Sequence, residues 1–227
     1  MSRRLGARDR PVGPAATPGP RADASLSGAP GALLIIISGP SGVGKDTIIA
    51  ALRRRPRDPD YHYVVTCTTR AQRPGEVDGV SYRFLSEAAF ADLRERGELL
   101  EWAEVHGHWY GTPREQVRTA LAAGRDVILK IDVQGARTVK AKVPDALLVF
   151  VLAPSMEALA ARLRARATES ADELEVRERN AAVELAHRDD YDHIVVNETG
   201  RVDETARRID EIAATERARH PDRRLRL

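Results

Sequence analysis

The sequence predicts an α/β protein in which a parallel β-sheet lies between two layers of helices. Short, continuously apolar segments such as "ALLIIISGP" and "ALLVFVLAP" indicate strands that are covered on both faces. Segments with helical apolar spacing alternate with them, which favours right-handed β-α-β crossovers and a three-layer arrangement. A chain of 227 residues is long enough for one such core with a small additional lobe.

The first predicted strand runs directly into a glycine-rich turn. "SGPSGVGKDT" places Gly39, Gly44 and Lys45 at the fixed positions of the Walker A pattern, G-x-x-x-x-G-K-[ST], and a helical segment follows. The N–H groups of such a loop and the start of its helix form an anion site, and Lys45 can reach the β- and γ-phosphates of a nucleotide. We therefore expect a P-loop NTPase core whose ATP contacts are Gly39, Pro40, Ser41, Gly42, Val43, Gly44, Lys45, Asp46 and Thr47.

One position in this loop departs from the pattern. Asp46 stands where a Ser or Thr hydroxyl would meet Mg²⁺. A carboxylate beside a triphosphate is repelled by roughly 1–4 kcal/mol at 4 Å per unit charge, unless it binds the metal or a cation balances it. Lys130 lies at the end of a strand that we expect next to the first one. Two hypotheses remain open: Asp46 is a Mg²⁺ ligand, or Asp46 pairs with Lys130.

The rest of the chain continues the alternation, with one interruption. "DVILKID" and "HIVVN" are further predicted strands. Helices are predicted over Gln134–Lys142, Met156–Arg164, Leu174–Asp189 and Asp203–Arg217. Between Tyr61 and Thr112, short β segments ("YHYVVTCTT", "VSYRFLS") surround the turn "RPGEVDG", and "EAAFADLRERGELLEWAEV" reads as a helix and then a strand. We expect a small inserted α+β lobe over about 61–112, which would hold a second substrate.

Charge is concentrated at the two ends of the chain. The formal net charge is +2, residues 1–30 hold five Arg against two Asp, and residues 217–227 hold five Arg against one Asp. The body between them is therefore acidic, which argues against nucleic-acid binding. We expect a disordered Pro/Gly/Ala-rich tail over 1–30, a folded domain over 31–220 and a solvated basic tail over 221–227. A transit peptide is the alternative for the first segment.

Other features of the composition mainly exclude classes of protein. A single cysteine, Cys67, excludes an internal disulfide framework and favours a reducing cytosol, with a buried structural thiol as its role. No apolar run approaches the ~18 residues of a membrane span. The histidines show no metal-ligand spacing.

Five segments in order resemble guanylate kinases over nearly all of 32–218. They are "SGPSGVGK", "TTRAQRPGEVDGVSYRF", "GELLEWAEVHGHWYGTP", "IDVQGA" and the lid-like "RLRARATES". The resemblance implies transfer of the γ-phosphate of Mg²⁺-bound ATP to GMP, and to dGMP as well, by a chain with a helical lid over about 164–180. It implies GMP contacts from Thr66, Arg70, Arg73, Tyr82, Glu101, Tyr110, Thr112 and Asp132.

The residue types fit these implied roles. The guanidinium groups of Arg70 and Arg73 suit a phosphate dianion. Guanine presents adjacent N1–H and N2–H donors, so the Glu101 carboxylate can accept both, whereas adenine would leave it unpaired. The GMP phosphate is itself the nucleophile, so no general base is needed. The resemblance assigns phosphate charge stabilisation to Lys45, Arg162, Arg166 and Arg177, and an adenine-side contact to Asn197.

Two further positions depart from the family pattern. Lys130 stands where many relatives carry an acid, and Ala167 replaces a lid glycine. Two other functions compete with the kinase reading: a non-catalytic interaction module, and a kinase of the same shape that acts on a sugar phosphate. The intact phosphate loop argues against the first, and the Glu101 segment argues against the second. The sequence leaves open whether the protein is a monomer or a homodimer.

Overall fold

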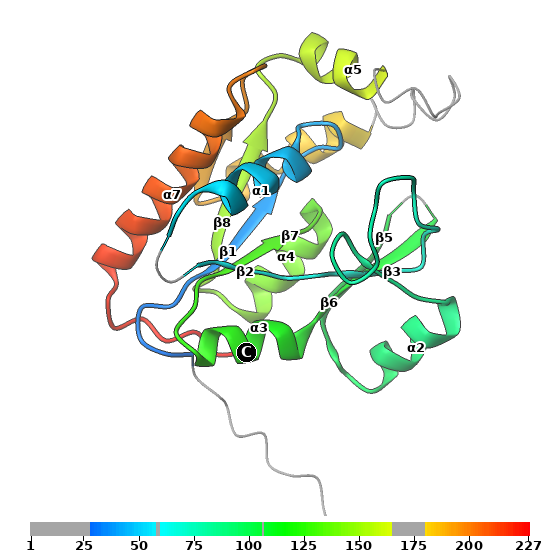
Figure 1. Ribbon diagram of the computed structural model, residues 1–227, viewed down its shortest axis with the longest axis vertical. Helices are drawn as coiled ribbons and strands as arrows, with labels where there is room; N and C mark the ends of the chain where they lie inside the picture. The colour runs from blue at the N-terminus through cyan, green and yellow to red at the C-terminus, as the bar shows by residue number, and fades with distance from the viewer. Residues whose placement is uncertain (1–27, 58–59, 106, 165–179) are drawn as a thin grey trace, which may run out of the picture.

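The computed structural model describes residues 28–57, 60–105, 107–164 and 180–227. The predicted α/β class is confirmed, because the main sheet has five strands in the order β2-β7-β1-β8-β9 and every neighbouring pair is parallel (Figure 1). Its strands are β1 Leu34–Ser38, β2 His62–Tyr63, β7 Val127–Lys130, β8 Leu147–Leu152 and β9 His193–Val196.

The central strand β1 explains why its sequence is apolar at every position. All five of its residues are buried, and Ile36 pairs with Leu129 of β7 on one side and Leu148 of β8 on the other. Alternate side chains of β1 enter two separate apolar clusters, so both faces of the strand need hydrophobic residues.

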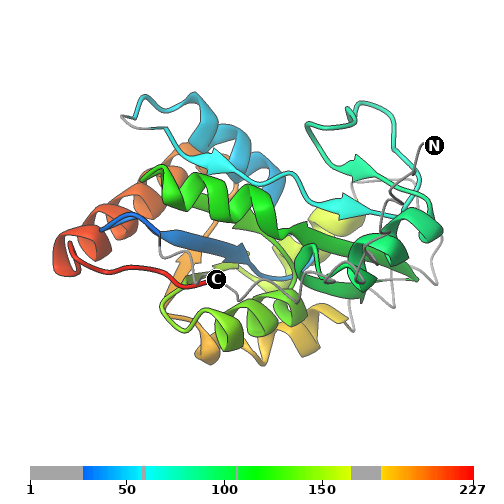
Figure 2. The same ribbon diagram turned by 90° about the horizontal axis from the view of Figure 1, so that it is seen from below.

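Helices cover both faces of this sheet. One apolar cluster joins the sheet to α1 and α7, and the other joins it to α3 and α4. Figure 2 shows α1 and α7 on one side of β1 and α4 on the other. The helices are α1 Lys45–Arg54, α3 Arg114–Ala122, α4 Val133–Lys142, α5 Met156–Arg164 and α7 Val202–Arg219, and a 3₁₀ turn, η1, spans Arg188–Asp190.

A second, smaller sheet lies beside the main one. Its four strands have the order β4-β3-β6-β5, and α2 packs on it through a cluster of Cys67, Phe90 and Leu99. The predicted buried thiol is therefore confirmed, with Cys67 completely inaccessible to solvent. The elements are β3 Cys67–Thr68, β4 Arg83–Phe84, α2 Glu87–Glu95, β5 Leu99–Val105 and β6 His108–Pro113.

The boundary expected for the inserted lobe was too early. β2 belongs to the main sheet, where His62 pairs with Val127 and Tyr63 with Ile128, so the second sheet begins at Cys67 rather than near Tyr61. The segment "YHYVVTCTT" reads as one β segment, but its two ends pair in different sheets.

The C-terminal residues are not the solvated tail expected from their charge. Leu225 is buried in the α3–α4 cluster, and its carbonyl accepts a hydrogen bond from the N–H of Gly28. The Arg223 carbonyl likewise accepts from the N–H of Gly31. Leu225 anchors this segment, while the neighbouring Arg224 and Arg226 are exposed.

The segment after α5 is only partly described. Residues 180–185 are helical, which agrees with the end of the helix predicted over Leu174–Asp189, although η1 replaces its last turn. Arg166, Ala167 and Arg177 lie outside the described residues, as does most of the lid expected over 164–180. Within the described ranges, no helix combines the length and apolar character needed to cross a bilayer.

Candidate functional site

The predicted phosphate loop lies at the carboxyl end of β1, directly before α1. Gly39 and Gly44 have positive φ angles of 138° and 95°. A Cβ at Gly39 would lie 2.3 Å from the carbonyl oxygen of Val151, and one at Gly44 would lie 2.6 Å from Asn197 Nδ2. Both positions therefore require glycine, because neither the backbone angle nor the space suits a side chain.

Lys45 is the first residue of α1, and its side chain turns back to the loop. Its Nζ donates to the carbonyl oxygens of Gly39 at 2.5 Å and Pro40 at 3.0 Å. Burial lowers the pKa of Lys45 to about 8, although Glu184 opposes the shift. This ammonium is thus poorly solvated, and an anionic ligand in the loop would stabilise its charge.

Sequence reasoning missed Glu184, which comes from the helical residues 180–185. Its carboxylate accepts a hydrogen bond from the N–H of Ser41 at 3.2 Å, and burial raises its pKa. Glu184 thus interacts with one of the loop N–H groups that were expected to face a phosphate. No motif signals this contact, because 143 residues separate the partners.

Arg162 and Asn197 hold the loop from the side of α5 and β9. Asn197 Nδ2 donates to the Val43 carbonyl at 2.8 Å, and Asn197 Oδ1 accepts from Thr205 at 3.1 Å. Arg162 donates to the carbonyls of Val43 and Asn197. Asn197 is buried and bonded at both ends of its amide, so the structure gives it a loop-supporting contact.

The expected contact between Asp46 and Lys130 is present. Lys130 Nζ lies 2.5 Å from Asp46 Oδ1, and it also donates to the hydroxyl of Tyr82 at 3.1 Å. Burial alone would lower the pKa of Lys130, but Tyr82 and Asp46 together raise it above the ordinary lysine value. Lys130 is therefore a cation, and it lies between the phosphate loop and the second sheet.

Three of the residues predicted to hold the GMP phosphate cluster together. Arg70 Nε donates to the hydroxyl of Tyr110 at 3.3 Å, and the rings of Tyr82 and Tyr110 meet edge to face at 6.0 Å. Glu76, which sequence reasoning did not single out, binds Arg70 through both carboxylate oxygens at 2.7 and 3.0 Å. The fourth residue, Arg73, is exposed, and its backbone N–H donates to Glu76.

Glu101 is a buried carboxylate at the contact between the second sheet and α4. Thr112 donates to Glu101 Oε1 at 2.5 Å, and the side chain is only 3% exposed. Burial raises the pKa of Glu101 to about 7, against the opposing effect of the Thr112 hydrogen bond. A Cβ at Gly135 would lie 2.8 Å from Glu101 Oε2, so the glycine of "IDVQGA" leaves room for the carboxylate.

Two other predicted GMP contacts have structural partners. Asp132 caps the start of α4, where its side chain accepts from the N–H of Gly135 at 2.8 Å. Its charge also raises the pKa of Glu101, after the larger effect of burial. Thr66 is buried just before β3, and its carbonyl accepts from the N–H of Arg83.

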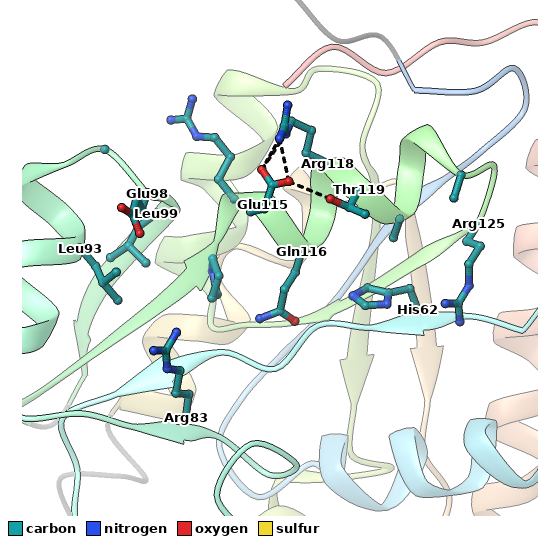
Figure 3. A pocket seen from close by; sticks show the side chains of 15 residues that line it. His62, Arg83, Leu93, Glu98, Leu99, Glu115, Gln116, Arg118, Thr119 and Arg125 are labelled. Carbon is teal, nitrogen blue, oxygen red and sulfur yellow. Dashed lines mark hydrogen bonds and ion pairs between the residues drawn. The ribbon is translucent and has the colours of Figure 1, made fainter.

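A pocket of about 930 Å³ lies away from these residues, between α3, the start of β2 and the turn that joins α2 to β5 (Figure 3). None of its lining residues belongs to the phosphate loop or to the predicted GMP contacts. Glu115 is bonded to Arg118 and Thr119, and Gln116 binds both backbone groups of Val65. This pocket is distinct from the candidate site.

A glycine-rich phosphate loop at the end of a central parallel strand, facing an Arg–Tyr cluster and a buried carboxylate on a second sheet, defines a P-loop nucleoside monophosphate kinase. The comparisons identify the family within this class. The model of the guanylate kinase family matches residues 32–216, so the chain belongs to the guanylate kinase family, whose members phosphorylate GMP with ATP.

Relatives support the same assignment. A guanylate kinase of Mycobacterium bovis is 46% identical over 183 residues, which covers 79% of this chain and 87% of the relative. One of Gloeobacter violaceus is 49% identical over 178 residues, with coverage of 78% and 86%. The crystal structure of guanylate kinase from Anaplasma phagocytophilum is 32% identical, has a TM-score of 0.65, and covers 82% of this chain and 86% of its own.

Proposed function

We propose that this chain uses Mg²⁺-bound ATP to phosphorylate GMP and dGMP at a site formed between the phosphate loop and the second sheet. The observation that carries the proposal is Glu101, a buried carboxylate bonded to Thr112 on the second sheet. An acceptor of this kind needs a ligand with donors, and the N1–H and N2–H groups of guanine are adjacent donors.

ATP would bind at the loop through its phosphates. The N–H groups of the loop, the N-terminus of α1 and the Lys45 ammonium provide positive potential at one place. Glu184 would give up its contact with the Ser41 N–H when a phosphate arrives, because the phosphate is a stronger acceptor and carries more charge.

The donor set fits Mg²⁺ at the loop. Asp46 offers hard carboxylate oxygens beside the phosphates, and Mg²⁺ in kinases is held by one or two carboxylates together with substrate phosphates. Among the described residues no three acidic, histidine or cysteine side chains form a metal cage, so the phosphates would supply the other ligands. When bound, the ion neutralises charge on the phosphate oxygens.

The GMP phosphate would bind at Arg70, Arg73, Tyr82 and Tyr110. Arg70 is already oriented by Glu76 and Tyr110, so its guanidinium loses little freedom on binding. Arg73 is exposed on the adjacent turn and free to swing toward the anion from the solvent side.

Catalysis would consist of alignment and charge stabilisation. The GMP phosphate is largely ionised at neutral pH and attacks the γ-phosphorus without a general base. Lys45 and Arg162 supply positive charge from the described part of the chain, and Arg166 and Arg177 would add to it from the lid. We assign Asn197 a place beside the adenine as well as its support of the loop. The lone, buried Cys67 suits the reducing environment of the cytoplasm as the place of action.

Release of ADP from Mg²⁺-ATP in the presence of different acceptors tests the proposal. The acceptors are GMP, dGMP, AMP, CMP, UMP and a ribose bisphosphate. We expect kcat/KM for GMP to exceed that for the other bases by several orders of magnitude. No turnover with any acceptor would support a non-catalytic module, and a preference for the ribose bisphosphate would support a sugar-phosphate kinase.

A further inference from the structure

Lys130 has no role in the site as described so far, yet its side chain contacts both halves of that site. Lys130 Nζ lies 2.5 Å from Asp46 in the phosphate loop and 3.1 Å from the hydroxyl of Tyr82 in the second sheet. It also lies 4.7 Å from the centre of the Tyr82 ring. One ammonium thus joins the loop expected to hold ATP to the tyrosine expected to hold the GMP phosphate.

The surroundings of Lys130 keep it charged and fixed. Its side chain is 20% exposed, whereas that of Asp46 is 67% exposed, so the pair lies at the wall of the site with the carboxylate toward solvent. Lys130 is also close enough to Lys45 to contribute to the lowered pKa of that lysine, after burial. The carboxylates of Glu184, Asp46 and Asp132 also act on Lys45, so acidic side chains balance the two ammonium groups in this structure, and a polyanionic ligand could take over that role.

Lys130 reaches this position because of the fold. It is the last residue of β7, which pairs with β1 through Ile37, and β1 leads directly into the loop. The side chains at the carboxyl ends of both strands therefore meet at one edge of the sheet. Asp46 lies in the first turn of α1 and limits the directions that the lysine can take.

We propose that Lys130 is a catalytic residue that binds the phosphoryl group during its transfer from ATP to GMP, and that Asp46 is a positioning residue that orients the Lys130 side chain. The proposal rests on the proposed function above. In the transfer, an oxygen of the GMP phosphate forms a bond to the γ-phosphorus of ATP, and the bond from that phosphorus to the bridging oxygen breaks. The electron pair leaves with ADP. Lys130 transfers no proton; it offsets negative charge on the oxygens of the transferring group.

Lys130→Met removes the charge and keeps most of the side-chain length, and Lys130→Arg restores a cation. Lys140→Met is the matched control, because Lys140 pairs with Asp192 at 3.0 Å away from the phosphate loop. We expect Lys130→Met to lower kcat on the order of a hundredfold, with a smaller change in the KM for GMP. Lys130→Arg should recover part of the loss, and Lys140→Met should stay within about twofold of the parent chain.

A binding measurement separates this proposal from the proposed function. The probe is a bisubstrate analogue in which adenosine and guanosine are joined by five phosphates, titrated by calorimetry with and without Mg²⁺. Lys130→Met should weaken its binding at least about tenfold and change that of GMP alone by less than about threefold. Equal affinities for the parent and Lys130→Met would overturn the role of Lys130, even in an enzyme that phosphorylates GMP. A parent chain that fails to phosphorylate GMP would instead overturn the proposed function.

The role of Asp46 has its own test in a double-mutant cycle. Asp46→Asn should weaken binding of the bisubstrate analogue without Mg²⁺ in the parent chain and have little further effect in Lys130→Met, because without the ion its contribution passes through the lysine. Equal and independent losses in both backgrounds would overturn the positioning role of Asp46.

Discussion

The main sheet and the second sheet are stabilised to different degrees. β1 is buried along its whole length, and large apolar clusters cover both faces of the main sheet. The second sheet contains the two-residue strands β3 and β4, and the buried members of its cluster are Cys67, Phe90 and Leu99. Because apolar burial dominates stability, the main sheet provides a rigid support for the phosphate loop. The residues proposed to contact guanine lie on the second sheet, which is less stable.

The key polar contacts lie where these two regions meet. Glu101 in β5 lies against Gly135 of α4, and Lys130 of β7 donates to Tyr82 of the second sheet. A change in the position of the second sheet would therefore alter the proposed guanine contact and the proposed phosphate contacts together. The main sheet thus contributes most of the stability, and under the proposed function the second sheet would select the base.

Truncation in the main sheet should have the largest effect, and it should act on stability. Ile36→Ala removes a completely buried side chain from the central strand. We expect the free energy of unfolding to fall by about 2–5 kcal/mol, measured by urea denaturation. Val80→Ala, at a residue 53% exposed, is the control and should change it by about 0.5 kcal/mol or less. A similar small loss for both variants would contradict the assigned role of the main sheet.

Substitution at Glu101 should act on GMP use instead. Glu101→Gln presents a donor where guanine also presents donors. The kcat/KM for GMP should therefore fall, by an amount that corresponds to about 2–4 kcal/mol of lost transition-state stabilisation. The melting temperature should not fall, because the variant no longer buries an ionisable group. Glu104→Gln, in the same strand but exposed, is the control and should leave both quantities nearly unchanged. A Glu101→Gln enzyme with parental kcat/KM would refute the base-reading role.

The same contrast explains how much could be predicted from the sequence. The long apolar runs of β1 and β8 predicted their strands well, because a strand buried on both faces admits few polar residues. The pairing of Asp46 with Lys130 was also predictable, since two unusual charges stood at the ends of adjacent elements. Both predictions depend on the regular architecture of the main sheet.

Other features carried no local signal. β2 and β3 are each only two residues long, so the sequence contains no periodicity that could separate one strand from the other. Leu225 is one apolar residue among arginines, and its burial depends on contact with the apolar cluster that includes α3 and α4. Glu184 reaches Ser41 across 143 residues. In each case the tertiary environment, rather than the local pattern, decides the outcome.

The pH dependence of GMP use should report the burial of Glu101. Its pKa is raised from 4.5 to about 7, so the folded protein binds this proton more tightly than the unfolded chain. Its contribution to stability is therefore lost as the pH rises from about 4.5 to about 7. GMP needs the ionised carboxylate, so kcat/KM should fall about tenfold from pH 8 to pH 6.

The GMP phosphate also titrates near pH ~6. Glu101→Gln is the control for this effect, because it keeps the titrating substrate and removes the carboxylate. Its profile should be flatter than that of the parent between pH 6 and 8. Identical profiles would show that Glu101 does not titrate in this range.

The smallest effect is expected from removal of residues 1–27, which precede the described part of the chain. Their Pro/Gly/Ala-rich composition offers little apolar surface for packing. Turnover and melting temperature should both remain nearly unchanged, as measured by ADP release and calorimetry on the truncated chain. A fall of several degrees in the melting temperature would show that this segment packs on the folded body.

The most direct test of guanine recognition compares GMP with inosine monophosphate, which lacks only the 2-amino group. The measured quantity is the ratio of their kcat/KM values in the parent chain and in Glu101→Gln. If the Glu101 carboxylate accepts from both N1–H and N2–H, the parent should prefer GMP by about tenfold to a hundredfold. The ratio should approach one in Glu101→Gln. An unchanged ratio in the variant would contradict the account, because the 2-amino group would then be recognised by another residue.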